Sequence, residues 1–412
     1  MRTEKRYAFL SGLCGVAVAL GMMSSPVNAA VTTQRGASIL AFPKVLANSE
    51  DGDTIIQITN ISNNMVHAHC FYVNAALDST RTPIWQVTDF SIWLTKQQPT
   101  HWQVGTGRFV NPSDTCTISN NSYIPSSSCG DAGLDPGAIP PVAENFVGEL
   151  KCVEVDVAGN PIGGNHLKGE ATLIAADDDV SKYNAIGIQG TDLAGETGNE
   201  LLLNQPIDTA EAVGQYDACP NTLFMNFIAE GATDPVLFAN LLGGTCANDA
   251  TVPCNSDADC ETTCNNPPQI TDSSGAVDLF SATLNDLTLI PCTEDFENQT
   301  PASATFQYLV YNEFEQSFSG STTVDCWFNS FLFQLDSPNN PFRSKFALPT
   351  LGSLAGSIKI SPVTGGILGV AGVTRANSAG ALTRTAVNLH MEGDRFSGSG
   401  GTVVDKITLP AE

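Results

Sequence analysis

The clearest hydrophobic pattern in the chain lies between Asp53 and Asn74, where apolar and polar residues alternate with a period of two. Ile56 and Ile58 share one side of the first half of this stretch. One side of the second half carries Val66, Ala68, Cys70 and Tyr72. An Asn-rich segment separates the halves, and Asn tolerates the backbone angles of a tight turn. The pattern predicts a β-hairpin, which needs further strands and a second layer to cover its apolar face.

Similar runs of apolar residues recur along the rest of the chain. They predict strands at 37–45, 87–95, 146–157, 167–175, 222–228, 276–291 and 403–409. In the run 146–157 the apolar side chains fall on both parities. A β-bulge near Cys152 would bring them onto one buried face.

The segments 305–312, TFQYLVYN, and 322–329, TTVDCWFN, predict a second hairpin that resembles the first. In both pairs the second strand carries a Cys followed by an aromatic residue. Two interpretations stay open, a degenerate repeat or a coincidence among aromatic strands. The predicted fold is all-β, an antiparallel β-sandwich, either one large sandwich or two related ones, with long loops and a small Cys-rich insert. The expected regions are an N-terminal β-sandwich at 30–215 and a C-terminal β-rich part at 216–412, with the insert at 245–268.

Residues 1–29 have the features of a cleaved export signal: basic residues, then an apolar run, then small residues before Ala30. The alternative is an uncut membrane anchor, but the apolar run 7–23 is shorter than the roughly 20 residues that a spanning helix needs. We therefore expect a secreted protein, in the periplasm, at the cell surface or in the medium, without membrane insertion.

Composition narrows the classes of partner. The formal net charge of −25 repels phosphate backbones, which disfavours nucleic-acid binding. Only 15% of the residues are charged, against about 25% in average proteins, so uncharged polar residues must cover most of the surface. A hydrophobic content of 42% with 20 Phe residues excludes a disordered chain.

Twelve cysteines, of which Cys14 lies in the export signal, make disulfides the default interpretation in an exported chain. The odd number that remains leaves at least one thiol unpaired or paired between chains. Cys70, on an apolar strand face, is the expected buried unpaired thiol. Zinc binding by the insert is the less favoured alternative, because paired C-x2-C spacing is lacking. The disulfide candidates are Cys116, Cys129, Cys219, Cys246, Cys254, Cys260, Cys264 and Cys292.

Met65, His67 and His69 alternate, so they share a strand face opposite Cys70. Two His at i and i+2 can reach one metal ion, and Met is a soft third ligand suited to copper, with His101 as a further candidate. The more common alternative places these residues on a half-exposed sheet face.

Calcium is a second hypothesis for the acidic run 177–179 and for Asn255, Asp257 and Asp259, although a solvated turn is the simpler interpretation of the run. No cofactor is otherwise indicated.

Some segments within residues 37–110 read ITNISNN, HCFYVN, DFSIWLT and QQPTHW. In these segments the chain resembles uncharacterised exported β-sandwich-like proteins of bacteria, and the likeness extends to GELKCVEVD and GNHLKGEATLI. The resemblance implies a secreted β-fold and no particular site residues. The Cys-rich insert departs from it.

The sequence contains no G-x-S-x-G, S-x-x-K or H-E-x-x-H motif of known hydrolases. We therefore expect a non-catalytic exported protein that acts as an extracellular or cell-surface binding or structural component, with an unknown extracellular ligand or protein as its partner. Two alternatives remain. One is an extracellular carbohydrate-active hydrolase that uses paired carboxylates. The other is a periplasmic metal-binding protein that uses His67 and His69.

Overall fold

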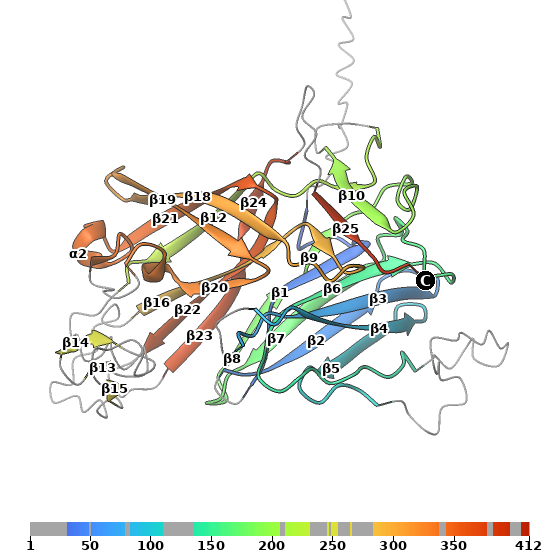
Figure 1. Cartoon of the computed structure of the whole chain (residues 1–412), viewed down its shortest axis with the longest axis horizontal. Coiled ribbons are helices and arrows are strands. Elements are labelled where there is room, and N and C mark those ends of the chain that lie inside the picture. The colour runs from blue at the N-terminus through green and yellow to red at the C-terminus, as the bar shows by residue number, and fades with distance from the viewer. Residues whose placement is uncertain are drawn as a thin grey trace, which may run out of the picture.

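The computed structural model describes residues 31–48, 51–78, 83–109, 135–206, 211–230, 245–246, 249–253, 264–265, 283–337, 343–376, 382–395 and 405–411. Strands dominate this part of the chain, which confirms the all-β prediction (Figure 1). Its two short helices are η2 (Leu332–Leu335) and α2 (Leu348–Leu351). No helix in the described ranges is long and apolar enough to cross a bilayer.

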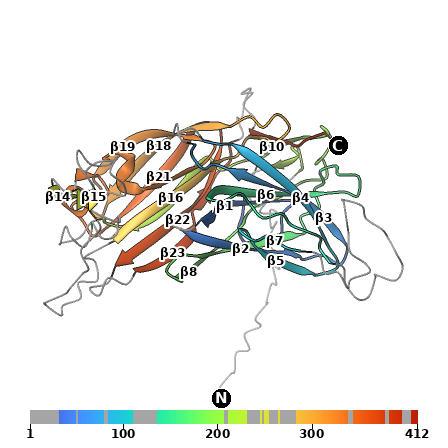
Figure 2. The same ribbon diagram turned by 60° about the horizontal axis from the view of Figure 1, so that its bottom comes forward.

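The N-terminal strands form a two-layered sandwich (Figure 2). They are β1 (Ile39–Asn48), β2 (Gly52–Asn60), β3 (Val66–Asn74), β4 (Gln86–Leu94), β5 (Pro99–Gln103), β6 (Phe146–Val155), β7 (Leu167–Ile174), β8 (Val180–Asn184) and β9 (Ile186–Ile188). One layer has the order β4-β3-β6-β1, and β9 also pairs with β1; the other layer is β5-β2-β7-β8. β1 and β2 pair only at their adjoining ends, so the sheet turns a corner there.

The core of this sandwich joins both layers. The indole of Trp102 on β5 donates a hydrogen bond to the Tyr72 hydroxyl on β3, at 2.5 Å, and its ring meets Phe90 of β4 edge-on. Gly169 on β7 leaves room for Phe42 of β1, since a Cβ at this glycine would lie 2.6 Å from the Phe42 ring. The two inner faces therefore interlock, as sandwich layers do.

The predicted hairpin between β2 and β3 is wrong. The two strands lie in different layers, and β2 pairs with β5 and β7 whereas β3 pairs with β4 and β6. The Asn60 side-chain amide donates to the backbone oxygens of Asn64, at 2.6 Å, and Thr95, at 2.9 Å, and so holds the connection that crosses between the layers. Alternation shows that each strand buries one face, but it does not identify the neighbouring strand.

The predicted bulge near Cys152 is also wrong. The register of β6 against β3 runs without interruption through Cys152, and the irregularity against β1 lies between Phe42 and Val45. Nine of the ten residues of β6 are buried. Its apolar residues fall on both parities because both faces of this strand are covered, as in the central strands of larger cores.

The C-terminal strands form a second sandwich. They are β12 (Thr222–Ile228), β16 (Thr283–Pro291), β18 (Ser303–Asn312), β19 (Ser317–Asp325), β20 (Phe328–Phe331), β21 (Ala355–Thr364), β22 (Ile367–Ala376), β23 (Leu382–Asn388) and β24 (His390–Glu392). The sheets β19-β18-β21-β12-β24 and β20-β16-β22-β23 enclose a core that includes Phe306, Leu287 and Ile358.

The second predicted hairpin is confirmed in β18 and β19, which pair from Ser303–Asp325 to Tyr311–Ser317. Its second strand begins earlier than expected and ends before Cys326. Because β2 and β3 do not pair with each other, the two pairs that looked alike in sequence are not equivalent in the fold.

Strands from both regions build a further sheet with the order β11-β10-β25-β17. These strands are β10 (Glu200–Gln205), β11 (Tyr216–Asp217), β17 (Glu294–Asp295) and β25 (Asp405–Thr408). Next to this sheet, Phe71 of β3 stacks on Phe296 at a centroid distance of 4.4 Å. The two sandwiches therefore share a hydrophobic core.

Within the predicted insert, β13 (Thr245–Cys246), β14 (Asp249–Pro253) and β15 (Cys264–Asn265) form a small sheet in the order β14-β13-β15. Cys246 and Cys264 are opposite each other in its register. Cys116, Cys129, Cys254 and Cys260 lie outside the described residues, as does the second calcium candidate at Asn255, Asp257 and Asp259.

The structure pairs Cys219 with Cys292 in a disulfide, in agreement with both being disulfide candidates. The expectation for Cys70 is wrong, because Cys70 forms a disulfide with Cys152. Their strands are neighbours, so the two side chains meet on one face of the sheet. The free thiol in the described part of the chain is that of Cys326, which is buried.

Candidate ligand-binding face

The outer face of the layer β5-β2-β7-β8 carries a row of polar side chains. His101, Gln57, Glu170 and Asn184 stand opposite one another on the four successive strands. The inward positions on these strands hold Ile56, Ile58, Trp102 and Ala171, all of them buried. Because side chains alternate along a strand, burying this apolar set forces the polar set outward.

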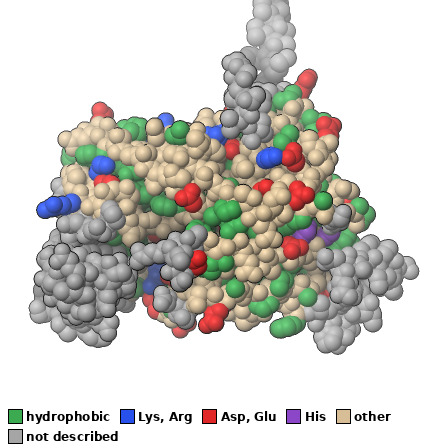
Figure 3. Space-filling model, viewed as in Figure 1, with side chains coloured by type: hydrophobic (Ala, Val, Ile, Leu, Met, Phe, Trp, Pro, Cys, Tyr) green, Lys and Arg blue, Asp and Glu red, His purple; other side chains and the backbone are tan. Residues whose placement is uncertain are grey.

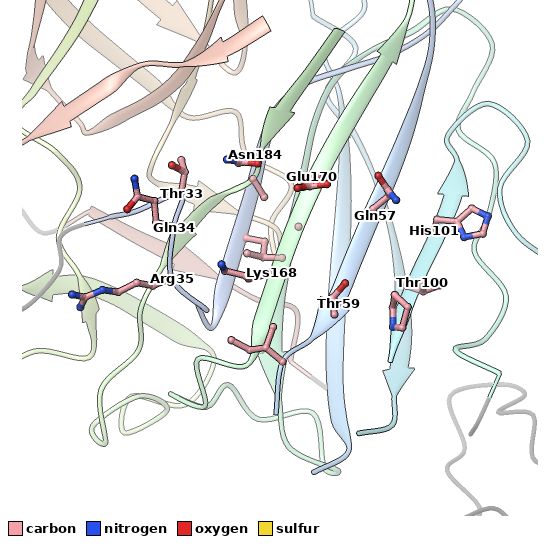
Figure 4. A pocket seen from close by; sticks show the side chains of 15 residues that line it. Thr33, Gln34, Arg35, Gln57, Thr59, Thr100, His101, Lys168, Glu170 and Asn184 are labelled. Carbon is pink, nitrogen blue, oxygen red and sulfur yellow. The ribbon is translucent and has the colours of Figure 1, made fainter. Parts of the chain in front are cut away.

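A second row lies beside the first, where Pro99 and Lys168 flank Thr59. The N-terminal segment with Thr33, Gln34 and Arg35 closes the far side, so the face is hollowed into a cavity of about 740 Å³ (Figure 4). Figure 4 shows the labelled polar side chains standing along neighbouring strands around this hollow. Most groups that line it are hydroxyls and amides, and Ile61 and Pro99 add apolar surface.

The charges of this cavity differ from those of the chain as a whole. Arg35 and Lys168 line it together with one carboxylate, that of Glu170. The Glu170 carboxylate forms an ion pair with Lys182 of β8, and both partners are about half exposed. The chain as a whole has a net charge of −25, but two basic side chains and one acidic side chain line this cavity. In the view of Figure 3, acidic groups are scattered over a mainly uncharged surface.

The His67 ring lies where the sequence predicts, on β3 together with that of His69, but it has protein partners. It stacks on Trp93 at 3.9 Å between centroids, and its Nδ1 lies 3.1 Å from the Asp156 backbone oxygen. Burial lowers the pKa of His67, so its ring is neutral at neutral pH. Its Nε2 is buried and has no hydrogen-bond partner.

The His69 ring nitrogen Nε2 lies 3.0 Å from the Asp89 carboxylate, and Met65, just before β3, is exposed. His101 lies on β5, in the opposite layer of the sandwich. Among the described residues no group of three or more His, Cys, Asp or Glu side chains is placed to hold a metal ion. The copper site at Met65, His67 and His69 therefore stays a prediction, which the metal content of the purified protein tests.

The acidic run at the β7–β8 turn has a basic partner. Both carboxylate oxygens of Asp177 accept hydrogen bonds from the Arg384 guanidinium, at 2.7 and 2.8 Å, and Asp179 accepts one from the Arg384 backbone N–H, at 2.5 Å. Hydrogen bonding to Arg384 lowers the pKa of Asp177. These contacts tie the turn to β23. Calcium binding by the acidic run stays a prediction.

Carboxylates also line a hollow around Asp53, Glu144 and Asp178. The Asp53 carboxylate accepts hydrogen bonds from the backbone N–H groups of Thr54 and Gly105 and from the Gln103 amide. It therefore holds the turn after β5 in place. The polar row on β5-β2-β7-β8 contains one carboxylate, that of Glu170. The paired carboxylates of the hydrolase hypothesis stay a prediction.

Sequence reasoning missed this polar face because its residues come from four strands, of which only β7 and β8 are consecutive in the chain. The only available signal was the outward parity of Gln57, Thr59 and His101. It also missed a pair formed by the buried Glu154 carboxylate and the partly exposed His166, whose Nδ1 lies 2.7 Å from it.

No family model and no curated protein matches this chain. Among solved structures, the Pleurotus ostreatus lectin POL in its apo form aligns over 90% of this chain and 81% of its own, with 10% identity and a TM-score of 0.15. A likeness this weak supports no conclusion about fold or function.

Proposed function

We propose that this chain is an exported, non-catalytic β-sandwich protein that binds a hydroxyl-rich ligand of the saccharide type on the outer face of β5-β2-β7-β8. The observation that carries the proposal is the in-register row His101, Gln57, Glu170 and Asn184 above the hollow. Support for export comes from the two disulfides among the described residues, since disulfides persist in oxidising compartments.

The cavity has the size and chemistry of a small-ligand site. Its volume of about 740 Å³ falls within the usual range of roughly 300–1,000 Å³. Amide and hydroxyl groups both donate and accept hydrogen bonds, which suits the hydroxyls of a sugar ring. Ile61 and Pro99 offer apolar contact to its C–H faces, and Lys168 and Arg35 favour a saccharide that carries a carboxylate.

A screen of the purified protein against an array of neutral and acidic saccharides tests the proposal, followed by calorimetric titration with the saccharide that binds best. We expect Gln57→Ala and Lys168→Ala each to weaken binding about 3- to 10-fold, the effect of losing one hydrogen bond.

Ser321→Ala is the matched control, because Ser321 is an exposed strand residue on the other sandwich and should leave affinity unchanged. A protein that binds no saccharide on the array, or variants that bind as tightly as the wild type, would refute this function.

A further inference from the structure

Three ionisable side chains meet between the two sandwiches, shielded from water. The Lys151 ammonium on β6 donates to the Glu149 carboxylate at 2.8 Å and to the Glu294 carboxylate of β17 at 2.9 Å. A third hydrogen bond, at 3.2 Å, runs to the Pro291 backbone oxygen. The side chains of all three ionisable residues are 0% exposed.

The cluster has one basic group, the Lys151 amine, and two acidic groups, the carboxyls of Glu149 and Glu294, so one ammonium cannot neutralise two carboxylates. Glu149 Oε1 and Glu294 Oε2 are buried and have no hydrogen-bond partner. Burial, reinforced by the neighbouring Glu149 carboxylate, raises the pKa of Glu294 well above its usual range despite the opposing effect of Lys151. Glu294 is therefore the acid of the cluster that retains a proton. Burial by itself would lower the pKa of Lys151, but the adjoining Glu149 and Glu294 side chains raise it, so Lys151 starts as an ammonium.

Such an arrangement brings an amine, a neutral carboxylic acid and a proton acceptor together in a dry site. The Lys151 nitrogen lies 2.9 Å from one Glu294 oxygen, so the amine and the carboxyl group are held in direct contact. The exclusion of water removes the solvent that would compete for the Glu294 carboxyl group. Lys151 must first give up a proton, and the Glu149 carboxyl group at 2.8 Å is placed to accept it.

We propose that Lys151 and Glu294 condense to an intramolecular amide bond, with Glu149 carrying the proton. Glu149 takes a proton from Lys151, and the free amine attacks the Glu294 carboxyl carbon. The new C–N bond forms, Glu149 returns the proton to the departing hydroxyl, and the C–O bond breaks. Glu149 then accepts the second proton that the nitrogen loses, so the product is an amide with one N–H and a protonated Glu149. One water molecule leaves and no oxidant or reductant is needed. The reaction occurs once in each molecule, so even a slow step suffices.

Glu294 is the acceptor because its carboxyl retains a proton, and because Glu149 stands two residues from Lys151 on the same strand. The bond to Glu294 would join β6 to β17 and hence the N-terminal sandwich to the C-terminal region. The sequence separation between the joined residues is 143. This proposal is independent of the saccharide function and uses none of its residues.

The test is the intact mass of the purified, folded full-length product, after its N-terminus has been determined and its disulfides reduced. We expect a mass lower than the sequence mass by one water, and a branched peptide joining Lys151 to Glu294 after proteolysis. A wild-type mass equal to the sequence mass would overturn the proposal and leave the cluster as an ion pair only.

Variants identify the roles. Lys151→Met and Glu149→Gln should keep their full sequence masses. Glu294→Gln should give the same amide bond. Its mass should fall by one ammonia instead of one water, because ammonia leaves when a carboxamide is attacked. Lys182 and Glu170, a Lys–Glu pair at the surface, are the internal control and should appear in unbranched peptides. If Lys151→Met still loses one water, Lys151 is not the amine of the bond and the proposal is overturned. The wild-type mass tests the proposal even if some variants fold poorly.

Discussion

Cys70 and Cys152 occupy directly opposed positions on the neighbouring strands β3 and β6, and their sulfur atoms form a disulfide. Both residues are fully buried in the core of the N-terminal sandwich. The bond closes a sequence separation of 82 residues, so it constrains a large loop of the unfolded chain.

Removing this disulfide should destabilise the fold. We expect the double substitution Cys70→Ala with Cys152→Ala to lower the free energy of unfolding by about 2–5 kcal/mol, from lost chain constraint and lost packing. Denaturant unfolding followed by circular dichroism measures the change. Cys326→Ala, which removes a buried thiol without a disulfide, is the control and should cost less. Equal midpoints for the double variant and the wild type would contradict this expectation.

The Cys326 thiol should resist alkylation in the native protein. Burial raises the pKa of Cys326 to about 12, so the reactive thiolate is scarce at neutral pH. Iodoacetamide treatment followed by peptide mass mapping should show Cys326 unmodified in the native state and modified in denaturant. Modification of the native protein at the rate of a free thiol would show that the residue is accessible.

Glu230 should make stability fall as pH rises. Its side chain is fully buried, its carboxylate accepts the Asn285 backbone N–H at 2.8 Å, and burial raises its pKa from 4.5 to about 8. Between these values the folded state keeps a proton that the unfolded state has released, so stability declines with rising pH through this window. The loss is on the order of 3 to 5 kcal/mol.

Glu230→Gln should remove this contribution, because the amide keeps an acceptor for Asn285 and does not ionise. Unfolding free energies measured from pH 4 to pH 9, which bracket the window set by the Glu230 pKa, should follow a flatter curve for the variant. Two parallel curves would show that Glu230 does not titrate with a raised pKa.

Gly169 should tolerate no larger side chain. A Cβ there would lie 2.6 Å from the Phe42 ring and 3.2 Å from the Ala185 Cβ, and Phe42 is fully buried. Gly169→Val should therefore destabilise the protein by about 1–3 kcal/mol through overpacking. The measurement is the thermal midpoint, compared with Thr172→Val on the same strand but on its outer parity. A midpoint for Gly169→Val as high as that of the control would contradict the close packing.

The polar face and the buried cluster could not be predicted from the sequence. His101, Gln57, Glu170 and Asn184 come from four separate strands, and their alignment depends on which strand edges pair. Lys151 and Glu294 are far apart in the chain, and a Lys within an apolar strand gives no indication of its partners. Cys70 was misassigned for the same reason, since its partner stands on a strand that follows a long intervening segment.

The sequence by itself determined the all-β class and the buried face of several strands. Phe90, Ile92 and Leu94 on β4 point into the core as their alternation requires, because a strand's two faces follow directly from a period of two. Only the tertiary structure decided that β2 and β3 lie in opposite layers and that Lys151 meets Glu294. Pairing between strands depends on backbone edges that are chemically alike in every strand, so the choice among them is made by the packing of the whole chain.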